Sequence, residues 1–155
     1  MDSLLFIRNE LLPELGKGWI VTLKLVFLSI PFGLLTGILI AIGRVYGNRL
    51  ISSLCRLYVI FFKGCPLLLL LFIIYFGLPS LGITFSPFGA SVLGFVICNG
   101  AYTSEYIRGA IQSVKTGQMI AAQALGMTKW QAVFYIILPQ AFHRALPGVG
   151  NEMIY

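Results

Sequence analysis

The chain has 155 residues, of which 58% are apolar and 10% are charged, and its net charge is +6. Because ordinary soluble domains are about 25% charged, this composition and a mean hydropathy of +0.91 exclude a soluble globular domain and a disordered chain, and they indicate a membrane protein. The basic residues lie between long apolar runs and not on an aqueous face, so we expect no nucleic-acid binding.

Residues 1–18 mix leucine and isoleucine with acidic and basic side chains. They lack the positively charged start of a secretory signal peptide. We therefore expect a short amphipathic helix along the membrane surface, followed by a separate membrane-embedded domain over residues 19–155.

Residues 25–43 carry no charge and predict a first span, because a helix of about 20 residues crosses the hydrocarbon core. Trp19 and Lys24 precede this run, as is typical of the membrane interface. Small residues recur every four positions along one face of the span: Gly33, Gly37 and Ala41. This stripe predicts close packing against another helix.

The next uncharged stretch, residues 64–104, is about twice as long as one crossing helix, so it must cross twice. Turn-forming residues cluster within residues 77–89 and mark the turn between the crossings. We expect a second span over residues 57–76, which places Lys63 near one membrane face, and a third span over residues 88–106.

Beyond Arg108 the sequence is too polar for hydrocarbon. A short helix is expected over residues 117–126, ending at Gly126, because glycine readily adopts the left-handed conformation found at helix ends. Thr128 and Gln131 match a capping box, which predicts that a new helix starts there.

Two apolar segments follow this helix–turn–helix. Residues 130–143 are too short to span, and we expect Pro139 to interrupt them. Residues 145–155 are typical of the beginning of a fourth span, and we expect the chain to continue past Tyr155. The predicted fold is thus an all-α transmembrane bundle with three full spans plus the start of a fourth.

Positive charges gather in two connecting segments. The first holds Arg44, Arg49 and Arg56, with Lys63 at its edge, and the second holds Arg108, Lys115, Lys129 and Arg144. The turn between the second and third spans has none. Because cytoplasmic loops are enriched in Lys and Arg, we expect both basic segments in the cytoplasm and the N-terminus outside.

The helix–turn–helix has two interpretations. It either connects two membrane segments or presents a docking helix that inserts into the groove of a partner protein. Its composition leaves both open.

A resemblance to a known family bears on this choice. Ile120-Ala121-Ala122, Gly126 and the later Ile136-Ile137-Leu138-Pro139 resemble the E-A-A-x-x-x-G and I-x-L-P elements of the EAA loop of ABC importer permeases, and residues 127–135 match the family's spacing. Further segments are similar to the branch that takes up polar amino acids: residues 63–68, 75–79, 99–102, 105–109, 138–141 and 146–152. The resemblance covers about residues 18–155.

The resemblance implies a type I ABC importer permease with about five spans in a bacterial inner membrane. It implies pairing with a second, identical or similar permease, ATP-binding cassette ATPase subunits on the cytoplasmic side, and an extracytoplasmic solute-binding protein that delivers a polar amino acid. The permease would have no catalytic residues and no cofactor, because ATP hydrolysis belongs to the partner.

The same resemblance implies a coupling segment within residues 113–131. The residues that would contact the ATPase are Ile120, Ala121, Ala122, Gln123, Leu125, Gly126 and Met127. Ile120 stands where the family motif has glutamate, and this removes a carboxylate worth about 0.3–1 kcal/mol in the first turn of a helix.

Polar residues within or beside the expected spans are candidates for a translocation pathway: Lys63, Asn99, Tyr102, Glu105, Arg108, Asn151 and Glu152. Each also has a structural interpretation. Glu105 and Arg108 are spaced to pair on one helix face, Lys63 is long enough to reach lipid phosphates, and Asn99 could hydrogen-bond between helices. The sequence leaves both interpretations open.

Two other classes of membrane protein are alternatives to a permease. An energy-independent channel or a secondary carrier for small polar solutes would show an internal repeat or a ring of charges. A membrane-embedded enzyme would need a catalytic constellation, and the chain has one histidine. Cys55, Cys65 and Cys98 lie in apolar stretches without CxxC spacing, so we interpret them as packing residues and expect no metal site.

Overall fold

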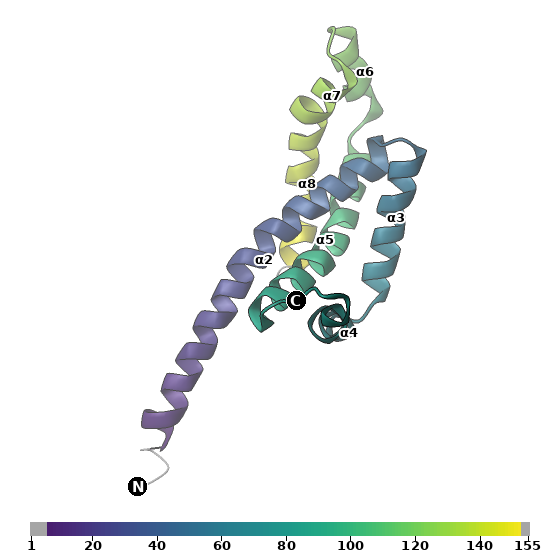
Figure 1. The fold of residues 1–155 in the computed structure, drawn as a ribbon. Coiled ribbons are helices and arrows are strands. Elements are labelled where there is room, and N and C mark those ends of the chain that lie inside the picture. The colour runs from purple at the N-terminus through teal and green to yellow at the C-terminus, as the bar shows by residue number, and fades with distance from the viewer. Residues whose placement is uncertain (1–5, 153–155) are drawn as a thin grey trace.

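The computed structural model describes residues 6–152, and all regular structure in this range is helical (Figure 1). The main elements are α2 (Leu12–Tyr46), α3 (Arg49–Gly64), α4 (Leu67–Phe72), α5 (Pro87–Ser113), α6 (Thr116–Ala124), α7 (Lys129–Ala132) and α8 (Leu138–Glu152). Short π- and 3-10-helical turns join them: η1 (Ile7–Leu11), η2 (Ile73–Gly77), η3 (Leu78–Leu81) and η4 (Val133–Ile137). The expected all-α class is confirmed.

The first helix is longer than expected and has no boundary at residue 18. Helical structure runs from η1 directly into α2, which extends beyond the other helices at its N-terminal end (Figure 1). Residues 1–5 of the expected surface helix lie outside the described residues, as do residues 153–155. The placement of the N-terminal segment along a membrane surface stays a prediction.

By length and apolarity, the helix Asn9–Tyr46 can cross a membrane. The pair Arg49–Gly64 and Leu67–Leu81 passes the same test if its two halves count as one span. Helix α5 is 27 residues long, about 40 Å at 1.5 Å per residue, but its middle carries more polar side chains. The number of spans therefore stays a prediction.

The close contact between α2 and α5 is built on the small-residue stripe. Ser29, Gly33, Gly37 and Ala41 are the buried residues of α2. Gly33 lies against Asn99 and Gly37 against Thr103, so the two helices run in the same direction. The predicted packing face is confirmed, since the absence of bulk lets the backbones approach.

The expected second span, residues 57–76, is not one continuous helix, and whether its two parts form one span stays a prediction. Helix α3 ends at Gly64, and the following helical stretch is bent away from it by 104°. Pro66 is the physical reason, because its ring forces the preceding residue out of the helical conformation, and Cys65 is extended at φ −86° and ψ 123°.

The predicted turn and the start of the third long helix are confirmed. A 3-10 turn in Leu78–Leu81 ends at Gly82, whose φ of 80° suits glycine. Ser86 then caps α5, because its hydroxyl accepts a hydrogen bond from the amide of Gly89 at 3.1 Å.

The predicted interruption at Pro139 is wrong. Helical structure continues from α7 through η4 into α8, so the expected start of a fourth span at residue 145 is the second half of one longer helical segment. The widened turn η4 carries a hydrogen bond from the amide of Leu138 to the carbonyl of Val133, and Pro139 follows it in the first turn of α8. Pro139 is tolerated there because the wide turn displaces the carbonyl that its ring would otherwise meet.

Two apolar clusters hold the helices together. The larger one joins α2, α5, η4 and α8 through Ala41, Ile107, Ile111, Ile137, Ala141, Ala145 and Val149. The smaller one joins α4 and η2 to the start of α5 through Leu70, Ile74 and Ala90. The larger cluster positions α6 and α7 at one end of the molecule, next to the turn between α2 and α3 (Figure 1).

Candidate functional site

A cavity of about 400 Å³ lies between α2, α4, α5 and α8. Its walls are Thr22, Leu25, Val26, Ser29, Ile30, Leu67, Phe95, Cys98, Asn99, Tyr102 and Glu152. Three of the residues predicted to line a pathway therefore share one cavity: Asn99, Tyr102 and Glu152. They come from α5 and α8, which are far apart in the sequence. We define this space as the central cavity.

Glu152 gives the central cavity an acidic group. Its Oε2 accepts a hydrogen bond from the hydroxyl of Tyr106 at 3.0 Å. Asn99 adds an amide whose Oδ1 accepts from the hydroxyl of buried Thr103 at 2.7 Å. The cavity therefore combines a mostly apolar wall with a few polar atoms, which is typical of small-molecule sites.

Lys63 lies beside Tyr102 but does not line the central cavity. Its ammonium nitrogen is 5.1 Å from the centre of the Tyr102 ring, and the Tyr102 hydroxyl donates to the Lys63 carbonyl at 3.4 Å. The expectation that Lys63 lies near a membrane face, at the edge of the basic segment that holds Arg49, stays a prediction. The two residues are at opposite ends of α3, about 21 Å apart along the helix, because the bend comes after Lys63.

Glu105 and Arg108 form an ion cluster away from the central cavity. Arg108 Nη2 is 2.8 Å from Glu105 Oε2, and Arg44 Nη1 donates to Glu105 Oε1. Arg108 also donates to Gln112 at 2.7 Å. Arg44 was expected to be a loop charge, and no local sequence pattern could reveal its partner Glu105, which lies on another helix.

Asn151, the remaining pathway candidate, is exposed on α8 and does not line the central cavity. Residues that the sequence did not single out do line it, among them Ser29 and Phe95. Ser29 belongs to the small-residue stripe of α2, which was the available signal. Nothing in the sequence pattern distinguished Phe95.

The helix–turn–helix forms as predicted. Gly126 takes a φ of 85° after α6. The hydroxyl of Thr128 accepts from the amide of Gln131, and the Gln131 side chain accepts from the amide of Thr128 at 2.8 Å, which completes the capping box.

Helix α6 has an outward and an inward side. Ile120 and the C-cap residue Leu125 are 66% and 85% exposed, whereas Ala122 is 4% exposed and is the buried residue of the helix. Ala121, Gln123 and Gly126 are also exposed, and Met127 is half-buried. The small Ala122 therefore serves packing within this chain, and the apolar tips available to a partner are Ile120 and Leu125.

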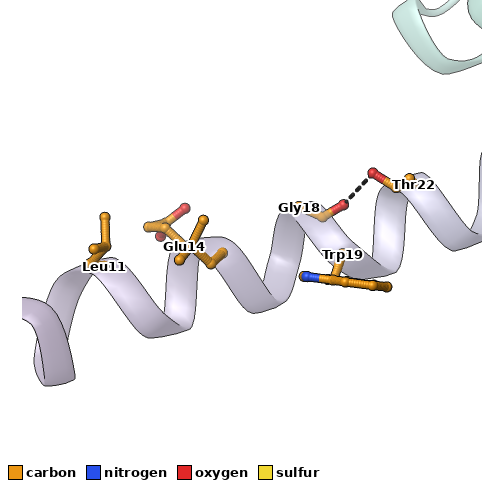
Figure 2. A pocket seen from close by; sticks show the side chains of 6 residues that line it. Leu11, Glu14, Gly18, Trp19 and Thr22 are labelled. Carbon is orange, nitrogen blue, oxygen red and sulfur yellow. Dashed lines mark hydrogen bonds between the residues drawn. The ribbon is translucent and has the colours of Figure 1, made fainter.

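A shallow hollow follows the N-terminal half of α2, along Leu11, Glu14, Leu15, Gly18, Trp19 and Thr22 (Figure 2). These residues belong to one helix, and the hydroxyl of Thr22 donates to the carbonyl of Gly18 at 3.0 Å. Trp19 is exposed, as expected of an interface anchor. Within residues 6–152, no group of His, Cys, Asp and Glu side chains could hold a metal ion.

Residues 29–155 match the family described as "Binding-protein-dependent transport system inner membrane component". A probable amino-acid ABC transporter permease protein, YckA of Bacillus subtilis, is 40% identical over 94% of this chain. A putative glutamine transport system permease protein, GlnP of Rickettsia bellii, is 42% identical over 89% of it. This chain spans 64% of the length of each relative.

A solved structure gives a consistent match. The crystal structure of an amino acid ABC transporter with histidines matches with a TM-score of 0.75 and 41% identity. The match covers 87% of this chain and 63% of the other.

Proposed function

This chain belongs to the family of binding-protein-dependent transport system inner membrane components, and on that premise we propose that it is the membrane-spanning permease subunit of an ATP-driven amino acid importer. The resemblance noted in the sequence is confirmed at the level of the family. The observation that carries the proposal is helix α6, which ends at Gly126 and exposes apolar side chains at one end of a bundle of apolar helices. Such a helix can transmit a partner's movement to the bundle.

In this proposal α6 is the coupling helix and docks on an ATP-binding cassette ATPase. Ile120 and Leu125 provide the contact, since both project from the helix as apolar side chains. The family's glutamate would make an ion pair with the ATPase at this position. Ile120 would instead be buried against the ATPase as an apolar side chain. Ala122 instead holds α6 on the bundle.

The translocation pathway passes through the central cavity in this proposal. The Glu152 carboxylate suits the ammonium group of an amino acid, and the nearby Lys63 ammonium suits its carboxylate. Asn99 and Tyr102 supply neutral polar groups. Glu105 and Arg108 are assigned to structure, because they are paired with each other and with Arg44.

The partners in this proposal are two ATPase subunits, a second identical or similar permease, and an extracytoplasmic solute-binding protein. The protein lies in a bacterial inner membrane with its N-terminus outside and the end that carries α6 in the cytoplasm. Basic residues near that end support this orientation. The names of the relatives support a polar amino acid as the substrate class.

Co-purification of the full-length permease with the ATPase tests the proposal. Replacing Leu125 with Asp puts a charge on the proposed contact and is expected to remove most of the bound ATPase. Leu81→Asp is the matched control, because Leu81 is 75% exposed and lies in the turn after η2, far from α6 in sequence and not part of the proposed contact.

Two results contradict the proposal. One is a Leu125→Asp permease that retains as much ATPase as the Leu81→Asp protein. The other is uptake by reconstituted wild-type transporter that continues when ATP hydrolysis is abolished.

A further inference from the structure

The C-terminal end of α2 is completed by a side chain from the segment after α6. The last carbonyls of a helix lack partners within the helix. Here the Gly43 carbonyl accepts from the Gly47 amide at 3.1 Å and the Arg44 carbonyl accepts from the Ser52 hydroxyl at 3.0 Å. The Tyr46 carbonyl accepts from the ammonium group of Lys129 at 3.4 Å.

Aromatic rings reinforce this contact. The Lys129 nitrogen lies 5.6 Å from the centre of the Tyr46 ring and 5.9 Å from that of Trp130. The Tyr46 and Trp130 rings meet edge to face at 6.4 Å. The ammonium group is therefore attracted by two rings and by the negative end of α2 at the same time. We define Tyr46, Lys129 and Trp130 as the clasp.

The position of Lys129 in α7 supports the interpretation that its role is to contact the C-terminus of α2. Lys129 is the first residue of α7, where the positive end of the helix dipole disfavours a cation. The same charge is favoured at the C-terminus of α2, which it reaches across the turn. The charge of Lys129 is therefore unfavourable for α7 and favourable for α2.

The clasp lies next to the inner side of α6. Tyr46 and Met119 pack against the same apolar cluster, and with Ile120 they line one cavity of about 400 Å³. The backbone of α2 makes few close approaches to α6 or α7. Side chains, and those of the clasp in particular, connect the helix–turn–helix to α2.

We propose that Lys129 is a positioning residue that fixes α6 relative to α2, so that displacement of α6 is passed to this spanning helix. The positioning is a property of the chain by itself. Its use in coupling ATP hydrolysis to transport rests on the proposed function. Two measurements separate these statements.

The first measurement is the distance between spin labels on the full-length permease without its partners. Labels at Leu39 of α2 and Leu125, both exposed, report on the position of α6 after the native cysteines, including Cys55, Cys65 and Cys98, are replaced by serine. Lys129→Met keeps the aliphatic stem and is expected to broaden the distance distribution. Lys129→Arg keeps the charge and is expected to restore the wild-type distribution.

Lys115→Met is the matched control, because Lys115 directly precedes α6 and lines the same cavity as Tyr46 and Met119, so the variant removes an equal charge near the clasp without removing a contact of the clasp. Within residues 6–152 the Lys115 amine makes no hydrogen bond or ion pair, so the distribution is expected to stay as in the wild type. A Lys129→Met protein with the wild-type distribution overturns the proposal. A Lys129→Arg protein whose distance distribution is as broad as that of Lys129→Met also overturns the proposal.

The second measurement is the stimulation of ATP hydrolysis by the substrate-loaded binding protein in proteoliposomes. Lys129→Met is expected to lower this stimulation about fivefold or more, whereas Lys129→Arg and Lys115→Met keep it. Unchanged stimulation in Lys129→Met overturns the coupling role. If the wild-type complex shows no stimulation, the proposed function fails while the label distances still decide the positioning role.

Discussion

At the scale of single residues, the absence of a Cβ atom at glycine allows α2 and α5 to pack closely. A Cβ atom at Gly37 would lie 2.9 Å from the Cβ of Thr103 and 3.1 Å from the backbone nitrogen of Ser104. Thr103 and Ser104 are fully buried and cannot move aside without disturbing α5. At Gly16 of the same helix, a Cβ would meet no atom within 4 Å.

These two glycines give a matched prediction. Gly37→Ala is expected to lower the stability of the full-length permease by about 1–3 kcal/mol through overpacking. Gly16→Ala is expected to leave stability unchanged or raise it by about 0.5–1 kcal/mol, because alanine favours the helix. Thermal unfolding in detergent, followed by size-exclusion chromatography, checks both. Equal midpoints for the two variants would contradict the packing argument.

Glu105 also contributes to the contact between α2 and α5. It accepts hydrogen bonds from Arg44 of α2 and Arg108 of α5, and all three side chains are largely shielded from solvent. The carboxylate therefore joins α2 and α5 by ionic hydrogen bonds, in addition to the small-residue and apolar contacts between them.

Glu105→Gln is expected to destabilise the permease by roughly 1.5–3 kcal/mol, the range for hydrogen bonds to charged groups. The control is Glu14→Gln, which breaks the exposed pair with Lys17 and is expected to shift the unfolding midpoint little. The same thermal assay measures both. A Glu105→Gln midpoint equal to that of Glu14→Gln would show that the cluster does not hold α2 and α5 together.

At the scale of elements, short-range hydrogen bonds define the helix–turn–helix. Gly126 ends α6 by adopting a positive φ, and the reciprocal bonds of Thr128 and Gln131 start α7. These bonds fix the direction in which α6 leaves the bundle.

Thr128→Ala removes the hydroxyl that accepts from the Gln131 amide, and we expect a local loss of about 0.5–2 kcal/mol. Amide hydrogen exchange measured by mass spectrometry should become faster in peptides that cover residues 126–135. Thr116→Ala is the control, because Thr116 starts α6 at the surface and its hydroxyl makes no hydrogen bond within residues 6–152. Unchanged exchange in Thr128→Ala would contradict the cap's contribution.

At the scale of the whole molecule, the chain has two chemically different ends. The end formed by α6, α7 and the turn between α2 and α3 carries Arg49, Lys115 and Lys129 (Figure 1). The turn before α5 carries no charged residue. This asymmetry predicts which end faces the cytoplasm.

Labelling with a membrane-impermeable maleimide tests the orientation. In a permease whose native cysteines are replaced by serine, Leu125→Cys should react in inverted membrane vesicles and not in intact cells. Leu81→Cys should show the opposite pattern, because it lies in the uncharged turn. Reaction of Leu125→Cys in intact cells would reverse the proposed topology and remove α6 from the ATPase.

The sequence alone determined features that depend on neighbouring residues. The stripe of Gly33, Gly37 and Ala41, the turn at Gly82, the end of α6 and the start of α7 follow from helical periodicity and from hydrogen bonds a few residues long. The order of short motifs also indicated the family, because their spacing is a property of the sequence itself.

Tertiary structure alone decided features that depend on which surfaces meet. The pairing of Arg44 with Glu105, the inward side of Ala122 and the gathering of Asn99, Tyr102 and Glu152 around one cavity all depend on the packing of different helices. The effect of a proline also depended on its surroundings. Pro66 bends the chain sharply because Cys65 before it is extended, whereas Pro139 stays in a continuous helix because the preceding turn is widened.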